Sequence, residues 1–167
     1  MLGRLMPDFF FDTFRGVTVD FLKKEGIGFL LVDIDNTLAP YEEALPNEQV
    51  TAWVREMREG GIAVALVSNN HVGRVELFSR DLGILAFADC HKPLKKKPLA
   101  IMAQMGAVRE QTATLGDQIF TDVWCARALG VRAILVPPIR DKKTLFFRFK
   151  RALEKPILRR YHKQHKF

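Results

Sequence analysis

Cysteine is scarce in this sequence of 167 residues, with Cys90 and Cys125 as its two thiols. Two cysteines are too few for the disulfide framework of a small secreted domain, and their spacing does not match a metal-binding motif. We therefore expect a folded protein of the reducing cytoplasm.

Long apolar runs are also lacking. The longest, near residues 27–32, is far too short for a bilayer-spanning helix, which takes about 20 apolar residues. The apolar N-terminal residues are interrupted by Pro7, Asp8 and Asp12, so no targeting segment is expected. With 48% hydrophobic residues and no internal repeat, the chain has the composition and length of one globular domain.

The basic charge is unevenly distributed. Residues 140–167 contain 11 Lys and Arg against 2 Asp and Glu, whereas residues 1–139 contain 15 basic and 17 acidic residues. The excess belongs to an interaction surface more than to the fold. We therefore predict a domain at residues 1–139, with a helical N-terminal segment, and a basic amphipathic helical tail at residues 140–167.

Short apolar runs alternate with helical patterns over residues 27–137. The apolar runs at 29–33, 62–67, 84–88, 112–115 and 131–136 read as strands, and amphipathic segments lie between them. This alternation predicts an α/β fold: a three-layer, doubly wound, Rossmann-like core with a parallel sheet of about five strands. In residues 1–25 we expect one or two short helices capped by Asp8 and Thr18.

Polar side chains follow several of these strands at their carboxyl ends. They are Asp33 and Asp35, Ser68 and Asn69, and Asp117, with Lys92 and Asp122 just beyond neighbouring strand ends. In a doubly wound sheet these ends open on one crevice. Carboxylates at the end of a buried strand cost desolvation unless they are paired, and a divalent cation suits them. The sequence therefore predicts a site for phosphate and Mg²⁺.

Four segments in this order resemble the haloacid dehalogenase-like (HAD) phosphatase superfamily. They are residues 33–38 (Asp-Ile-Asp-Asn-Thr-Leu), Ser68-Asn69, Lys92-Pro93, and 116–118 (Gly-Asp-Gln) with Asp122. More narrowly, residues 5–8, 67–70 and 116–122 resemble the capless YqeG-type branch of subfamily IIIA, which is similar to phosphatidylglycerophosphate phosphatases. The resemblance covers about residues 27–137 and implies a HAD core.

The resemblance implies catalytic roles. Asp33 would be the nucleophile that forms an aspartyl-phosphate, and Asp35 the general acid and base. Ser68 and the backbone N–H of Asn69 would bind the phosphoryl oxygens, and Lys92 would bind phosphate and offset charge in the transition state.

The same resemblance implies a magnesium site. Mg²⁺ would be held by the carboxylates of Asp33 and Asp117 and by the backbone carbonyl of Asp35. Asp122 would contact the ion through water, and Thr37 would brace the turn after the first strand.

The spacing of the motifs leaves no room for a cap domain. Only 32 residues separate Asp35 from Ser68, and 23 separate Ser68 from Lys92, which is enough for one helix and one strand each time. An uncapped site suits a phosphate carried by something large, such as a protein, a nucleic-acid end or a lipid head group. A lid supplied by another chain is the alternative.

Apolar and basic residues alternate in the tail at helical spacing. Placed at 100° steps, Leu145, Phe146, Phe149, Leu153 and Ile157 share one face, and Arg148, Arg151, Lys155 and Arg159 lie opposite. Residues 141–163 would suit an anionic membrane surface. A helix packed on the body with a solvated basic face fits equally well, and nucleic-acid binding is a weaker third interpretation.

These observations predict a Mg²⁺-dependent phosphomonoester hydrolase. The resemblance implies that it dephosphorylates phosphatidylglycerophosphate to phosphatidylglycerol, at the cytoplasmic face of the membrane. One alternative is a HAD phosphatase acting on nucleic-acid ends or phosphoproteins. Another is a receiver-like signalling module that is phosphorylated on aspartate without turnover, although Asp35 supplies the acid and base that turnover requires.

Overall fold

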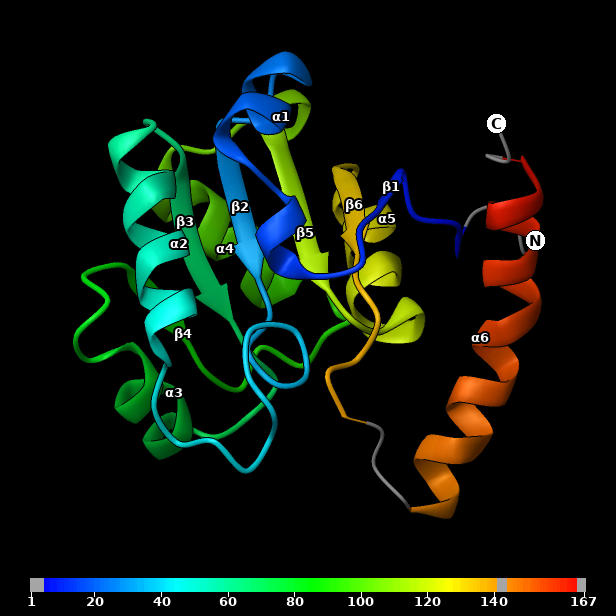
Figure 1. Ribbon diagram of the computed structural model, residues 1–167. Coiled ribbons are helices and arrows are strands. Elements are labelled where there is room, and N and C mark those ends of the chain that lie inside the picture. Colours follow the sequence, from blue (N-terminus) through cyan, green and yellow to red (C-terminus); the bar gives the residue numbers. More distant parts are fainter. Residues whose placement is uncertain (1–4, 141–143, 165–167) are drawn as a thin grey trace.

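The structure, a computed structural model, describes residues 5–140 and 144–164, without the side chains of Phe146 and Phe147. A sheet of six parallel strands forms its centre, in the order β1-β6-β5-β2-β3-β4 (Figure 1). The strands are β1 (Phe9–Phe10), β2 (Phe29–Val32), β3 (Ala63–Val67), β4 (Leu85–Phe87), β5 (Thr112–Gly116) and β6 (Arg132–Leu135). This confirms the predicted α/β class, with one strand beyond the five expected from the sequence.

Helices cover both faces of the sheet. One core lies under α1 (Val19–Lys24), α2 (Glu48–Glu59) and α3 (Val72–Ser79), and the other under α4 (Lys96–Met105), α5 (Trp124–Leu129) and α6 (Leu145–Gln164). Leu30 and Val32 of β2 enter the first core and Leu31 the second, because side chains alternate along a strand. The central strands β2 and β3 are apolar throughout, as the sequence pattern indicated.

The connections after β2 and β3 hold little besides a helix each. Residues 33–47 form a turn and loop before α2, and α3 follows β3 directly. The predicted absence of a cap domain is therefore confirmed, and the carboxyl edge of the sheet stays open.

Of the one or two short helices predicted in residues 1–25, the structure contains the one capped by Thr18 but not one capped by Asp8. Phe9–Phe10 is instead the edge strand β1, followed by the 3₁₀ turn η2 (Phe14–Gly16) and then α1, whose N-cap is Thr18 as predicted. Asp8 caps no helix: its carboxylate accepts hydrogen bonds from the Ala133 N–H (2.7 Å) and from Arg127 (2.9 Å). Phe9 and Phe10 pack on opposite faces of the sheet, a non-local arrangement that outweighs local helix signals.

Helix α6 packs against the side of the domain, near β1 (Figure 1). Its inner face buries Glu154, Ile157 and Tyr161, and Phe10 lies against the rings of Tyr161 and His162. Ile157, which the sequence pattern placed on the membrane-facing side, is therefore part of the core. Within the described ranges, no helix combines the length and apolar content needed to cross a bilayer.

The docking of α6 predicts that truncating two apolar residues of this helix will change the free energy of unfolding by different amounts. Ile157→Ala should lower the free energy of unfolding by about 2–5 kcal/mol, because it leaves a cavity in the core. Phe149→Ala should change it by no more than about 0.5 kcal/mol, because the Phe149 ring is 64% exposed. Urea denaturation of both variants measures this. Equal, small effects would show that α6 is not docked and that residues 140–167 form the separate tail predicted from the sequence.

Candidate active site

A tight turn after β2 orients the first two aspartates. The Asp33 N–H still donates to Leu115 of β5 (2.9 Å), so Asp33 continues the line of the strand. The chain then reverses around Ile34, whose carbonyl accepts the N–H groups of Thr37 (3.2 Å) and Leu38 (3.0 Å). Asn36 adopts a left-handed conformation (φ 63°), which asparagine tolerates better than most residues.

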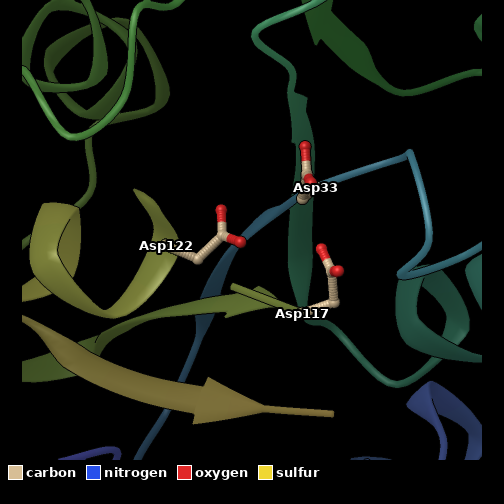
Figure 2. Close-up of side chains that lie close together, drawn as sticks. All are labelled: Asp33, Asp117 and Asp122. Carbon is tan, nitrogen blue, oxygen red and sulfur yellow. The ribbon is translucent and has the colours of Figure 1, made fainter. Parts of the chain in front are cut away.

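Three buried carboxylates converge at the end of the sheet: Asp33, Asp117 and Asp122 (Figure 2). One oxygen of each lies within 4.8 Å of one of each of the others. Asp117 follows β5 directly, and Asp122 lies in the π-helical turn η4 (Ile119–Val123). Gly116 makes the approach possible, since a Cβ at this position would collide with the Asp122 carboxyl group.

Lys92 bridges two of these carboxylates. Its ammonium lies 3.0 Å from Asp33 Oδ1 and 2.7 Å from Asp122 Oδ1, and the side chain is almost fully buried. Asn69 holds the backbone of Lys92 in place: its amide oxygen accepts the Lys92 N–H (2.6 Å), and its amide nitrogen donates to the Lys92 carbonyl (2.9 Å). Two of the three predicted phosphate-binding residues, Asn69 and Lys92, thus contact each other directly.

Asp35 faces other partners. Its Oδ1 accepts hydrogen bonds from the Arg74 guanidinium (3.2 and 3.4 Å), and its Oδ2 accepts one from the Asn70 amide (3.1 Å). Ser68 is buried at the end of β3, and its hydroxyl accepts the Asn70 N–H (3.0 Å). Neither Arg74 nor Asn70 was predicted as a site residue. The position of Asn70 directly after the Ser68-Asn69 motif was the sequence feature that could have identified it as a site residue.

The predicted residues Thr37 and Asp122 lie close to the cluster. The Thr37 hydroxyl donates to Asp117 Oδ1 at 3.5 Å, so it links the turn after β2 to the end of β5. Asp122 stands among the clustered carboxylates themselves. The Asp35 carboxylate is not part of this cluster among the described residues.

Three further residues of the site come from α6. Arg151 donates to the Asp117 carboxylate (2.5 Å), to the Asp117 carbonyl (2.8 Å) and to Glu154 (2.8 Å). Glu154, 1% exposed, accepts the Ile119 N–H (2.9 Å). Lys150 donates to the Gln118 side chain (2.6 Å). The sequence pattern placed Arg151 on an outward basic face, but its guanidinium points at Asp117.

Burial and mutual repulsion perturb the acidic groups. Burial, together with Asp122 and Asp117, raises the pKa of Asp33 to about 8 against the opposing charge of Lys92. Burial and Asp122 likewise raise the pKa of Asp117 to about 6, although Arg151 opposes this. Burial alone would lower the pKa of Lys92, but Asp122 and Asp33 outweigh it and raise that pKa above its usual value.

The charges around the cluster do not balance. Four acidic side chains face two basic ones: Asp33, Asp117, Asp122 and Glu154 against Lys92 and Arg151. With all four acids ionised, two negative charges would remain in a buried setting, where an uncompensated charge is costly. A divalent ion that prefers hard oxygen ligands fits this donor set, with carboxylates of the cluster as its ligands.

A pocket of about 300 Å³ opens in front of the cluster. Its walls combine the aspartates of the first motif with donors from four neighbouring segments: Asp33, Asp35, Asn36, Tyr41, Ser68, Asn69, Asn70, Lys92, Gln118, Thr121 and Lys150. All the predicted catalytic residues line it, while Asp117 lies deeper. Hydroxyl, amide and ammonium donors around carboxylates suit a phosphoryl group.

Comparison with known proteins agrees with this geometry. The Hydrolase_like family model, described as HAD-hydrolase-like, matches residues 90–138. A curated relative, the Probable phosphatase YqeG of Bacillus subtilis (strain 168), is 34% identical over 153 residues, which cover 92% of this chain and 89% of the relative.

Solved structures show the same fold at lower identity. The cobalt-bound deoxy-D-mannose-octulosonate 8-phosphate phosphatase of Haemophilus influenzae superposes with a TM-score of 0.52 and 21% identity, covering 82% of this chain and 90% of that one. The hypothetical protein XCC2798 of Xanthomonas campestris superposes with a TM-score of 0.55 and 19% identity, covering 76% of this chain and 73% of that one. The fold, the motif residues at one sheet edge and the similarity over nearly the whole chain establish that this protein belongs to the YqeG-type phosphatases of the HAD superfamily.

Proposed function

We propose that this phosphatase is a Mg²⁺-dependent phosphomonoesterase that works through an aspartyl-phosphate and acts on phosphatidylglycerophosphate. The observation that carries the chemistry is the position of Asp33. Its carboxylate is at once in the acidic cluster, within 3.0 Å of the Lys92 ammonium and on the wall of the open pocket. An aspartate so placed can attack phosphorus while positive charge offsets the growing negative charge.

The first half of the reaction transfers the phosphoryl group to the enzyme. A carboxylate oxygen of Asp33 bonds to phosphorus as the bond from phosphorus to the ester oxygen breaks, and the leaving alkoxide takes a proton from Asp35. Ser68 and Asn69 line the same pocket and can bind the oxygens of the group in transfer. Arg74 and Asn70 hold the Asp35 carboxylate in place for proton transfer.

The second half releases phosphate. Asp35, now ionised, removes a proton from a water molecule whose oxygen bonds to phosphorus, and the bond between phosphorus and Asp33 breaks. Inorganic phosphate leaves and both aspartates return to their starting states. Mg²⁺, when bound by the carboxylates of the acidic cluster and the predicted Asp35 carbonyl, would neutralise charge on the phosphoryl oxygens.

The proposed lipid substrate is supported by the open site and by the outer face of α6. We use "outer face" for the exposed apolar residues Leu145 (82% exposed), Phe149 (64%) and Leu153 (46%), with Arg148 and Arg159 exposed beside them. Apolar side chains flanked by arginines suit the interface of an anionic bilayer. The same helix contributes Lys150 to the pocket wall, so a membrane bound at the outer face would lie near the site. The proposed reaction would then take place at the inner face of the cytoplasmic membrane.

The assignment of Asp33 as the nucleophile predicts a large loss of activity when its carboxylate is replaced by an amide. Asp33→Asn should reduce kcat for p-nitrophenyl phosphate more than a hundredfold, about 2.7 kcal/mol of barrier, because the amide cannot form the acyl phosphate. Circular dichroism should show an intact fold. Retention of more than about 1% of the activity would remove Asp33 from the role of nucleophile.

The metal assignment predicts a change in magnesium dependence. Chelation should abolish turnover, and Asp117→Ala should shift the Mg²⁺ titration of activity to at least about tenfold higher concentration, because a charged ligand is lost. Thermal unfolding with and without Mg²⁺ gives a second readout. Asp81→Ala, an exposed acidic residue outside the site, is the matched control. A titration for Asp117→Ala that overlays the wild type would exclude Asp117 as a ligand.

The substrate assignment predicts a dependence on the outer face of α6. The double variant Phe149→Ser, Leu153→Ser should lower the ratio of turnover on phosphatidylglycerophosphate in anionic vesicles to turnover on p-nitrophenyl phosphate. Added salt should lower the same ratio in the wild type, because screening weakens the attraction of Arg148 and Arg159 to the surface. A panel of phosphorylated oligonucleotides and phosphopeptides tests the alternatives. Faster release of phosphate from either class than from the lipid would replace the lipid assignment.

A further inference from the structure

Helix α6 is fixed against the active site by polar contacts as well as by its apolar residues. Arg151 binds both the side chain and the backbone carbonyl of Asp117, and Glu154 joins Arg151 to the Ile119 N–H. Glu154 and Ile157 are each 1% exposed. The turn of α6 that carries these contacts is therefore held at a defined position beside the pocket.

Lys150 occupies the pocket wall as a result. It is half-buried, it lines the same pocket as Ser68 and Lys92, and its ammonium donates to the neutral Gln118 side chain at 2.6 Å. Among the described residues no carboxylate lies within ion-pair distance of Lys150. An ammonium carries three donors, so the Gln118 contact leaves donors for a ligand.

The other basic residues around the pocket are committed to carboxylates. Lys92 bridges Asp33 and Asp122, and Arg74 binds Asp35. Arg151 binds Asp117 and Glu154. Lys150 thus differs from them in kind: it offers the pocket a positive charge that no acidic side chain of the described chain offsets by direct contact.

We propose that Lys150 is a specificity-determining residue that binds a second anionic group of the substrate, next to the phosphoryl group being removed. The proposal rests on the proposed function, because phosphatidylglycerophosphate carries a phosphodiester in addition to its terminal phosphomonoester. Asp33 and Lys92 hold the monoester end, and Lys150, which α6 contributes to the pocket wall, meets the diester. A substrate with a single phosphate would leave Lys150 unused.

Competition experiments with the full chain test this without requiring that the competitors be hydrolysed. The two competitors are glycerol 3-phosphate, with one phosphate, and glycerophosphoglycerol phosphate, the deacylated head group with two. Each is titrated against p-nitrophenyl phosphate hydrolysis, and the ratio of the two inhibition constants reports the second anionic contact. Lys24→Ala is the matched control, since it removes the same charge from an exposed residue of α1.

The wild type and Lys24→Ala should bind the two-phosphate compound at least about tenfold more tightly, as expected for one hydrogen bond between charged groups. Lys150→Ala should bring the ratio close to one, Lys150→Arg should keep most of it, and Lys150→Glu should reverse it. No preference in the wild type, or the same ratio in Lys150→Ala as in the wild type, would overturn the proposal. Hydrolysis of the lipid itself is measured separately, so a wrong lipid assignment and a wrong role for Lys150 give different results.

Discussion

The burial of Asp33, Asp117 and Asp122 within 4.8 Å of one another is the constraint on which the rest of this structure depends. Like charges in a buried setting repel strongly and each loses its hydration, so the arrangement persists only with compensation from several directions. Lys92 supplies part of it from the loop after β4, and Arg151 supplies another part from α6. The surplus of acidic over basic side chains is what makes the site suited to a divalent ion. Folding stability and readiness for phosphoryl chemistry are thus opposed here, as is common at active sites.

The contacts of α6 change how the C-terminal segment is understood. By composition it is a basic tail, yet its inner face supplies Arg151 to a proposed metal ligand and Lys150 to the pocket, while its outer face exposes apolar and basic residues. A single helix therefore joins the residues of the pocket to the outer face, for which we propose contact with lipid. In a phosphatase without a cap, such a helix can form the wall that selects substrates.

The open pocket has a second consequence. Because the connections after β2 and β3 hold no inserted domain, this chain has no cap of its own to close over a substrate in the pocket. Selectivity then depends on groups at the rim and on where the protein is located. This is why the proposed roles of Lys150 and of the outer face of α6 belong together: one recognises the head group, and the other brings the pocket to the surface that carries it.

The sequence by itself determined the fold class and the edge of the sheet at which the candidate site lies. Buried strands can be recognised in the sequence as apolar runs, and in a parallel sheet their carboxyl ends lie along one edge. The positions of these runs alone therefore place Asp33, Ser68 and Asp117 at one edge of the sheet. Tertiary structure alone decided which face of α6 is docked, because helical periodicity shows that a helix has two faces but not which neighbour each one meets. Arg151 donates a hydrogen bond to Asp117, 34 residues away in the sequence. The Asp8 carboxylate accepts one from the Ala133 N–H, 125 residues away. Contacts of that range depend on packing across the whole domain, which no local pattern encodes.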